Sequence, residues 1–271
     1  MAVFTCRFDS KALGFGTAFR MILPIPFVDG KKYQEHYEKK EKLPVLWLLH
    51  GGSDNYADWH DCTLVQLLAD EYGIAVLMPD AQNGSYANMA YGPDWFTYLS
   101  EEFMEFVYQR FPVSRERKDN FISGMSMGGL GTFKMALRFP ERFAAACPIA
   151  SAVDLMYEYV HHDTDPREFF GREFEKIFGH FENPQELIGS VEDCYALLDQ
   201  DIAEGRKLPA MMMAQGTEDF TYKGNKRFYE YASKKGVSIE WIEEPGVHDW
   251  KSWNLYLPKV FEFIGKVRIR A

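Results

Sequence analysis

The residues best suited to chemistry in this chain form the pentapeptide Gly124-Met125-Ser126-Met127-Gly128, which directly follows the apolar run 120–123. A Gly-x-Ser-x-Gly between a strand and a helix holds its serine on a sharp turn, so that the hydroxyl projects beyond the end of the sheet. Glycine suits both flanking positions because a side chain there would collide with neighbouring strands or with the following helix. The segment 129–139 has helical apolar spacing and ends before Pro140, so we predict that Ser126 is a nucleophile.

The expected base for this serine is His248. A serine hydroxyl is a weak nucleophile at neutral pH and needs a base, which in turn needs a group that sets its tautomer. His248 follows the apolar run 239–243 and precedes the last helical segment, where the loop carrying such a base belongs. By contrast, His161 and His162 lie in a polar stretch typical of a solvated loop. His180 ends a helical segment, where it would complement the helix dipole.

The expected acid is Asp219, in the loop directly after the apolar run 211–214. A carboxylate beyond the end of a strand can reach a histidine on the last loop. Glu218 is adjacent and stays open as an alternative, although neighbours on a turn point in different directions. Asp154, just beyond the strand that follows the Ser126 helix, is the main rival, and Asp249 is better explained as an acid in the first turn of a helix.

An oxyanion that forms on the substrate needs two hydrogen-bond donors. The backbone N–H of Met127, next to the nucleophile, is one expected donor. His50-Gly51-Gly52 follows the apolar run 44–49 and supplies the other, because its glycines let the backbone approach the substrate closely. We expect this donor to be Gly52, with Ser53 as the alternative. Losing one such donor costs roughly 3 kcal/mol of transition-state stabilisation.

Short apolar runs alternate with longer helix-like segments, which is typical of a mainly parallel sheet covered by helices on both faces. With 271 residues and 46% hydrophobic content, the chain has enough material for one substantial core, so we predict a single α/β domain over 1–271. Strands are expected at 15–24, 44–49, 74–79, 120–123, 144–150, 208–214 and 237–242, and helices at 58–72, 93–110, 129–139, 225–235 and 250–266.

Charge, apolar run lengths and cysteine spacing argue against nucleic-acid, membrane and zinc-binding proteins. A formal charge of −10 and a pI near 5.3 argue against a nucleic-acid partner, which would favour a basic stripe. No apolar run reaches the length of a membrane span. The four cysteines, Cys6, Cys62, Cys147 and Cys194, are too widely spaced to indicate a zinc site or a disulfide framework. The first ten residues lack a signal-peptide pattern, so we expect a cytoplasmic protein without metal or cofactor.

Together these motifs resemble the esterase D group of α/β-hydrolases, and among them its bacterial tributyrin-type acetyl esterases. The resemblance covers nearly the whole chain. It is carried by Leu49-His50-Gly51-Gly52, Tyr91-Gly92, Gly124–Gly129, Pro140-Glu141, Gly216–Asp219 and Pro245–Trp253. It implies an α/β-hydrolase fold, no cofactor, and hydrolysis of short-chain acyl or phenolic esters through an acyl-enzyme. The roles transferred by motif are nucleophile for Ser126, acid for Asp219, base for His248, and oxyanion donors for Gly52 and Met127.

Relatives in the same group include S-formylglutathione hydrolases, feruloyl esterases and acetylxylan esterases. The first usually carry Thr-Cys after the glycine of the oxyanion loop, where this chain has Ser53-Asp54, so the resemblance favours the esterase branch. Trp59, Phe133 and Trp250 are candidates for the substrate pocket, with core packing as the alternative for each. The polar-aromatic segment 83–91 is either a pocket rim or a surface loop.

The helix-rich segment 153–207 is predicted to be an insertion. In this fold such an insertion commonly caps the active site, and its phenylalanines would then line the cap or pack it onto the sheet: Phe169, Phe170, Phe174, Phe178 and Phe181. A non-catalytic binding protein on the same fold and an acyltransferase are the competing functions. The expected partner is a small ester, and a homo-oligomer is left open.

Overall fold

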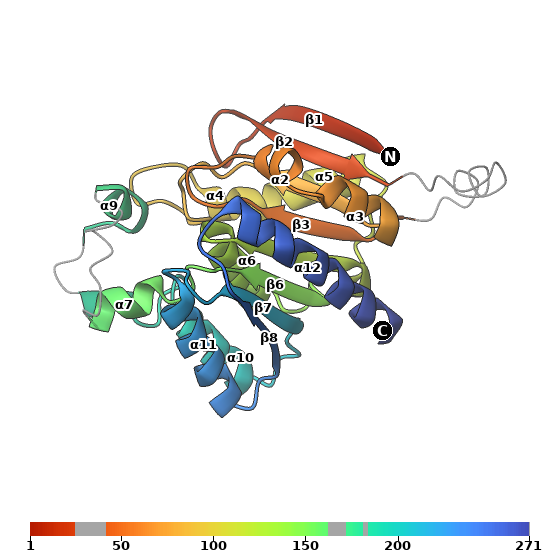
Figure 1. The fold of residues 1–271 in the computed structure, drawn as a ribbon. Coiled ribbons are helices and arrows are strands. Elements are labelled where there is room, and N and C mark those ends of the chain that lie inside the picture. The colour runs from red at the N-terminus through yellow and green to blue at the C-terminus, as the bar shows by residue number, and fades with distance from the viewer. Residues whose placement is uncertain (25–41, 162–171, 181–183, 271) are drawn as a thin grey trace.

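The computed structural model describes residues 1–24, 42–161, 172–180 and 184–270, which form one eight-stranded sheet (Figure 1). The strand order is β1-β2-β4-β3-β5-β6-β7-β8. Strands from β4 to β8 in that order run parallel, whereas β1 and β2 are antiparallel. The bounds are β1 Ala2–Asp9, β2 Gly16–Leu23, β3 Val45–Leu49, β4 Ala75–Pro79, β5 Asn120–Met125, β6 Ala145–Ile149, β7 Ala210–Gly216 and β8 Ile239–Glu244.

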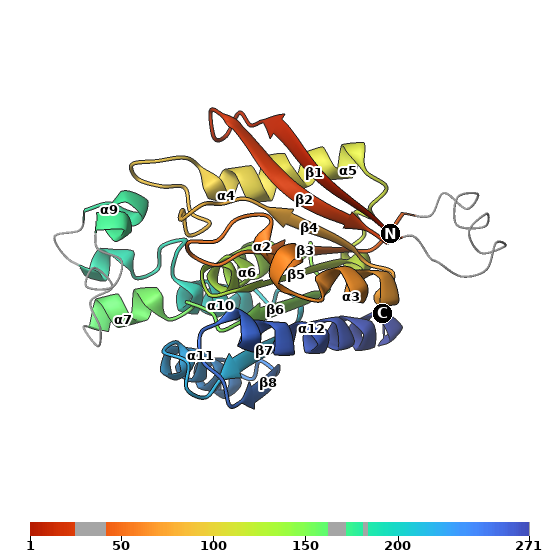
Figure 2. The same cartoon turned by 45° about the horizontal axis from the view of Figure 1, so that its top comes forward.

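Helices cover both faces of the sheet (Figures 1 and 2). One layer contains α2 (Asp58–Cys62), α3 (Val65–Tyr72) and α12 (Trp250–Arg270). The other contains α4 (Trp95–Thr97), the π-helical η1 (Tyr98–Phe103), α5 (Met104–Arg110), α6 (Met127–Arg138), α10 (Cys194–Ala203) and α11 (Tyr222–Lys234). Short helices η2 (Arg117–Asp119), α7 (Leu155–His161), α9 (Arg172–Phe178) and η3 (Pro184–Leu187) complete the described elements.

The apolar runs of the sequence become central strands because both of their faces are buried. In β3, Leu46 and Leu48 pack in the core on the α12 side, while Trp47 and Leu49 pack on the opposite side. All five residues of this strand are inaccessible to solvent, as expected for a parallel strand between two helical layers. The predicted mainly parallel α/β sheet is confirmed.

Two predicted helices differ from the structure in more than their end residues, and one strand was missed. The helix expected at 58–72 is divided into α2 and α3, and the helix expected from Pro93 begins at Trp95 and contains a π-helical turn. The strand β1 was not predicted. It lies at the edge of the sheet with most of its side chains exposed or half-buried, so it lacks the continuous apolar run of the central strands.

The predicted insertion has α7 and α9 at the carboxyl end of the parallel strands (Figures 1 and 2), whereas its α10 packs against α6 in the helical layer. Its described part contains α7, α9, η3 and α10 and no strand. Phe174 and Phe178 are buried in a small apolar cluster with Ala87, which belongs to the loop after β4. The other three phenylalanines, Phe169, Phe170 and Phe181, lie outside the described residues. That this segment caps the site stays a prediction.

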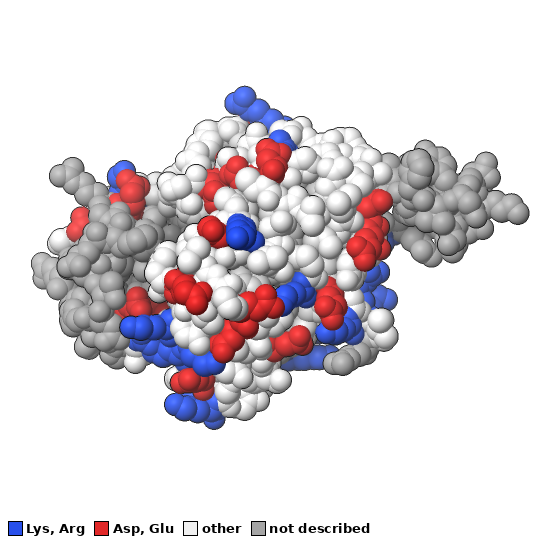
Figure 3. All heavy atoms as spheres, in the orientation of Figure 1, with Lys and Arg blue, Asp and Glu red and all other residues white. Residues whose placement is uncertain are grey.

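Among the described residues, no helix combines the length and apolar character needed to cross a membrane. No cluster of three metal-ligating side chains occurs in this part of the chain. Figure 3 shows acidic and basic side chains intermixed over the face that α12 crosses. Cys147 lies fully buried within β6, and burial raises the pKa of its thiol, so it behaves as a small apolar side chain.

Candidate active site

Ser126 occupies a strained turn between β5 and α6. Its backbone has φ 55° and ψ −118°, in the half of conformational space that residues other than glycine rarely adopt. A Cβ added to Gly124 would lie 2.5 Å from the carbonyl oxygen of Gly128, and one added to Gly128 would collide with the backbone of Leu49 and His50. Both glycines therefore permit the close approach that the sequence predicted.

Replacing Gly128 by alanine is expected to destabilise the protein by about 3 kcal/mol or more, because the colliding atoms belong to rigid backbone. Gly73→Ala is the matched control. Gly73 has φ 63° but open space around its added Cβ, so the cost is the strain alone, about 1 kcal/mol. Urea unfolding measures both free energies. If Gly128→Ala lowers the free energy of unfolding no more than Gly73→Ala does, the predicted collision at Gly128 is contradicted.

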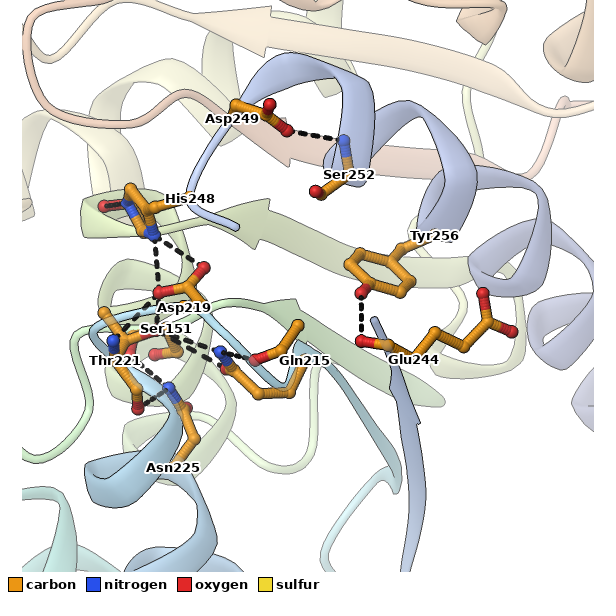
Figure 4. Close-up of polar contacts among 12 residues, drawn as sticks. Ser151, Gln215, Asp219, Thr221, Asn225, Glu244, His248, Asp249, Ser252 and Tyr256 are labelled. Atoms are coloured by element: carbon orange, nitrogen blue, oxygen red, sulfur yellow. Dashed lines mark hydrogen bonds and ion pairs between the residues drawn. The ribbon is translucent and has the colours of Figure 1, made fainter. Parts of the chain in front are cut away.

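Ser126, His248 and Asp219 form one continuous line of hydrogen bonds. The Nε2 atom of His248 lies 2.9 Å from Oγ of Ser126, and Nδ1 lies 2.8 Å and 3.0 Å from the two carboxylate oxygens of Asp219. Figure 4 shows the His248 ring directed at Asp219. Because a carboxylate only accepts, Nδ1 carries the proton and Nε2 is free to accept the proton of Ser126. The side chain of Asp219 is only 1% exposed.

Thr221 orients the Asp219 carboxylate. Both its backbone N–H and its hydroxyl donate to Oδ1 of Asp219, each at 2.8 Å. Asn225 in turn donates to the carbonyl oxygens of Thr221 and Ser151, which ties this turn to the segment after β6 (Figure 4). The Asp219 carboxylate is therefore held by Thr221 as well as by His248. The sequence analysis did not identify Thr221, although a threonine two residues after an aspartate is a known turn signal.

The two rival acids are engaged elsewhere. Glu218 accepts a hydrogen bond from the backbone N–H of Gly246 at 2.6 Å. Asp154 accepts a hydrogen bond from the hydroxyl of Tyr195 and lies 3.2 Å from the guanidinium of Arg227. Of the carboxylates weighed from the sequence, the structure brings Asp219 to the histidine.

Two further alternatives, Asp249 and His180, make other contacts. Asp249 accepts from the backbone N–H of Ser252 at 2.8 Å and so caps the start of α12, and this bond lowers the pKa of its carboxyl. His180 is exposed beyond the end of α9. His162 and the side chain of His161 lie outside the described residues.

The two expected oxyanion donors come from different segments: Met127 directly follows Ser126, and Gly52 lies in the loop after β3. Met127 is the first residue of α6, so its N–H has no partner within that helix. Among the described residues, neither this N–H nor that of Gly52 donates to another protein group. The N–H of Ser53, the alternative donor, is already bound to Oδ1 of Asn83 at 2.6 Å. The structure therefore favours Gly52 over Ser53.

A cavity of about 600 Å³ lies beside Asp219, between the start of α7 and the loop 217–224. Phe220 lines it and is 63% exposed, although it is a large apolar side chain. Its ring lies against His248, with 4.4 Å between the ring centroids. Sequence reasoning missed Phe220, whose only signal was its position next to the acid.

Two of the three pocket candidates belong to the core. Phe133 is fully buried against Phe228, which favours core packing, the alternative that the sequence left open for it. Trp59 is also buried and donates through its indole N–H to the carbonyl oxygen of Leu49. Trp250 is half-buried and packs edge-on against Trp59 at 5.3 Å.

Segment 83–91 is not a simple pocket rim. Tyr86 is buried, and its hydroxyl donates to the carbonyl oxygen of His50 at 3.1 Å. Asn88 exchanges two hydrogen bonds with Thr97 at the start of the following helix. Tyr86 therefore supports the loop after β3, whereas Asn88 is exposed and ties the segment to the following helix.

Comparison with known proteins identifies relatives of the whole chain. The family model described as "Putative esterase" matches residues 31–264. An acetyl esterase from Caldicellulosiruptor saccharolyticus is 31% identical over 270 residues, which cover 98% of this chain and 99% of that protein. Both matches include every segment of the site, and the acetyl esterase aligns with this chain almost from end to end.

Two solved structures from Staphylococcus aureus are similar in fold and sequence. The fluorophosphonate-binding serine hydrolase F, with substrate bound, gives a TM-score of 0.83 at 31% identity, covering 97% of this chain and 98% of that one. An S-formylglutathione hydrolase without ligand gives a TM-score of 0.82 at the same identity and coverage. The α/β-hydrolase fold expected from the sequence is thus confirmed.

Proposed function

Because this chain belongs to the esterase family and is a carboxylic ester hydrolase, we propose that it cleaves short-chain acyl esters through an acyl-enzyme on Ser126. The observation that carries the proposal is the hydrogen-bonded line from Ser126 through His248 to Asp219. Each member comes from a different loop at the carboxyl end of the sheet. This arrangement is a catalytic triad in chain order Ser, Asp, His.

In the proposed mechanism, His248 removes the hydroxyl proton of Ser126 as Oγ attacks the ester carbonyl carbon. The carbonyl oxygen becomes an oxyanion and accepts hydrogen bonds from the N–H groups of Gly52 and Met127. The alcohol then leaves with the proton from His248. Water attacks the acyl-enzyme with His248 again as base, and the carboxylic acid departs as Ser126 is restored.

The proposed substrates carry acetyl to butyryl groups on small alcohols or phenols. The name of the acetyl esterase relative supports the short acyl group. The alcohol portion lies next to His248 when that residue protonates it, so we assign it to the cavity lined by Phe220. S-formylglutathione is the second candidate, since a structure with that name is 31% identical. The cap role of 153–207, a cytoplasmic location and a homo-oligomer stay predictions.

A panel of esters tests the proposed function. It contains p-nitrophenyl acetate, butyrate and octanoate, methyl ferulate, acetylated xylo-oligosaccharides and S-formylglutathione. We expect the highest kcat/KM on acetate or butyrate, and a fluorophosphonate probe should label Ser126, as located by peptide mass spectrometry. Failure of the wild-type protein to label, under conditions that label a control esterase, would favour a binding protein over an enzyme.

Replacing Phe220 by alanine is expected to raise KM for aryl esters about three- to tenfold, because an aromatic contact contributes about 0.5–1.5 kcal/mol. Turnover of ethyl acetate should change little, since its alcohol has no ring. Phe4→Ala on the edge strand β1 is the control, because Phe4 is also an exposed phenylalanine. Equal KM values for aryl esters in wild type and Phe220→Ala would remove Phe220 from the binding site.

A further inference from the structure

Lys134 is a lysine with no exposed surface, on the helix that begins at the nucleophile. Its ammonium forms an ion pair with Glu192, which lies just before α10. It also donates to the carbonyl oxygen of Tyr86 at 2.7 Å and to that of Ser85 at 3.4 Å. A buried charge is retained only where its partners compensate the loss of water, so these contacts need an explanation.

The two carbonyl groups belong to strained backbone. Ser85 and Tyr86 have φ values of 50° and 47°, which residues with a side chain adopt at a cost of about 1–3 kcal/mol each. The Lys134 ammonium binds directly at this strained turn. The charge therefore stabilises one particular conformation of the loop 81–86, which follows β4.

The Tyr86 ring lies on the same helix. A Cβ added to Gly131 would lie 2.7 Å from the Tyr86 ring, so glycine is required there for the ring to approach. Met127, Gly131 and Lys134 are spaced by four and three residues and so share one face of α6. On this face of α6, Met127 is an expected oxyanion donor, Gly131 contacts the Tyr86 ring, and Lys134 binds the Tyr86 backbone carbonyl.

The loop 81–86 is joined in turn to residues 50–53, the oxyanion loop. The Tyr86 hydroxyl donates to the carbonyl oxygen of His50, and the Ala81 N–H donates to Nε2 of the same histidine at 2.9 Å. Nδ1 of His50 donates to the carbonyl oxygen of Gly51 at 2.7 Å. With the bond from Ser53 to Asn83, the oxyanion loop is bound on both sides of Gly52.

We propose that Lys134, Glu192 and Tyr86 are positioning residues that set the place of the Gly52 N–H relative to the Met127 N–H. This inference rests on the proposed function, since it takes those two groups as the oxyanion donors. Contacts lead from α6 through Lys134 and Tyr86 to the oxyanion loop. Because Met127 belongs to α6, this helix fixes the positions of both donors. A donor displaced by about 1 Å loses much of its effect on the transition state.

The same contacts link the oxyanion loop to the segment 153–207. Glu192 belongs to that segment, and the backbone N–H groups of Ala90 and Tyr91 donate to carbonyl oxygens of α9, each at 2.9 Å. The segment that is predicted to cap the site therefore also holds the loop that supports Gly52. A substrate contact that moves this segment would therefore change the position of the Gly52 N–H through Glu192 and Lys134.

The test uses two variants of the full chain. Tyr86→Phe removes only the hydroxyl that binds His50. Lys134→Met combined with Glu192→Gln removes both charges together, which avoids leaving one buried charge unpaired. We expect kcat on p-nitrophenyl acetate to fall about tenfold in Tyr86→Phe and about 10- to 100-fold in the double variant. KM should stay within twofold of wild type, because the ground-state ester makes little use of the donors.

The rate is expressed per site titrated with the fluorophosphonate probe, so that loss of folded protein does not count. A merely structural role lowers the number of titratable sites and Tm but leaves this rate unchanged. The inhibition constant of phenylboronic acid, whose oxygen occupies the place of the oxyanion, should rise in parallel with the fall in kcat/KM. Tyr98→Phe is the control, because Tyr98 is a buried tyrosine whose ring packs against Phe103 and Trp95 and whose hydroxyl does not bind the oxyanion loop.

A Tyr86→Phe rate per titrated site within twofold of wild type overturns the inference, even if the double variant does not fold. That result leaves the proposed function intact as long as the probe labels Ser126 in the wild-type protein. If the probe labels another residue, the proposed function fails and the inference fails with it. The location of the label therefore separates the two outcomes.

Discussion

Replacing Ser126 by alanine is expected to lower kcat by about six orders of magnitude while the protein keeps its fold. Alanine retains the Cβ that the strained turn already accommodates, and it removes only Oγ, which lies 2.9 Å from His248. Without this oxygen no acyl-enzyme forms. The oxyanion donors then act only on direct attack by water, which leaves a small residual rate.

The measurement is turnover of p-nitrophenyl acetate by the purified variant, together with labelling by the fluorophosphonate probe. Both should be lost. Ser123→Ala is the control, because Ser123 is buried three residues earlier in β5 and its hydroxyl only donates to the carbonyl oxygen of Cys147. Its turnover should stay within a few-fold of wild type. Wild-type turnover by Ser126→Ala would show that another residue is the nucleophile.

Replacing Asp219 by asparagine is expected to lower kcat by about four orders of magnitude. The carboxylate now holds the proton of His248 on Nδ1, so that Nε2 accepts from Ser126. An amide N–H in the same place would donate to Nδ1 and move the ring proton to Nε2. The histidine could then no longer remove the serine proton.

The comparison with the rival acids makes this prediction specific. Asp154→Asn and Glu218→Gln should retain kcat within about tenfold, because neither carboxylate contacts His248 in the structure. Thermal unfolding checks that each variant is folded. A loss of four orders of magnitude in Asp154→Asn, with activity retained in Asp219→Asn, would transfer the role of acid to the end of β6.

The central strands were predictable from the sequence because a strand buried on both faces consists almost entirely of apolar residues. Each is a short apolar run, and β3 to β7 were placed within about two residues of their observed bounds. The edge strand β1 escaped prediction because its residues alternate between exposed and half-buried positions and gain their structure from pairing with β2. The break between α2 and α3 was missed for a similar reason, since helical spacing continues across it.

The site was predictable where a residue type and its local turn carry the chemistry. Ser126, Asp219 and His248 were each recognised from the strand that precedes them, and parallel strands bring such loops to one edge. Gly52 was preferred over Ser53 from the sequence, but the contact that supports this preference was not predictable. It depends on Asn83, which is thirty residues away and accepts the Ser53 N–H. For Phe133 the sequence left pocket and core open, because apolar residues look alike in sequence whether they face a pocket or the core.

The sequence alone indicated the turn at Ser126, the chain order of Ser126, Asp219 and His248, and the family. Each of these depends on neighbouring residues and on the types of side chain that the chemistry requires. Only the tertiary structure brings the Asp219 carboxylate to His248, leaves the N–H of Gly52 without a partner among the described residues, and buries Lys134 against the loop 81–86. Those properties are distances between segments far apart in the chain. They follow from how the sheet and its two helical layers pack, which no local pattern records.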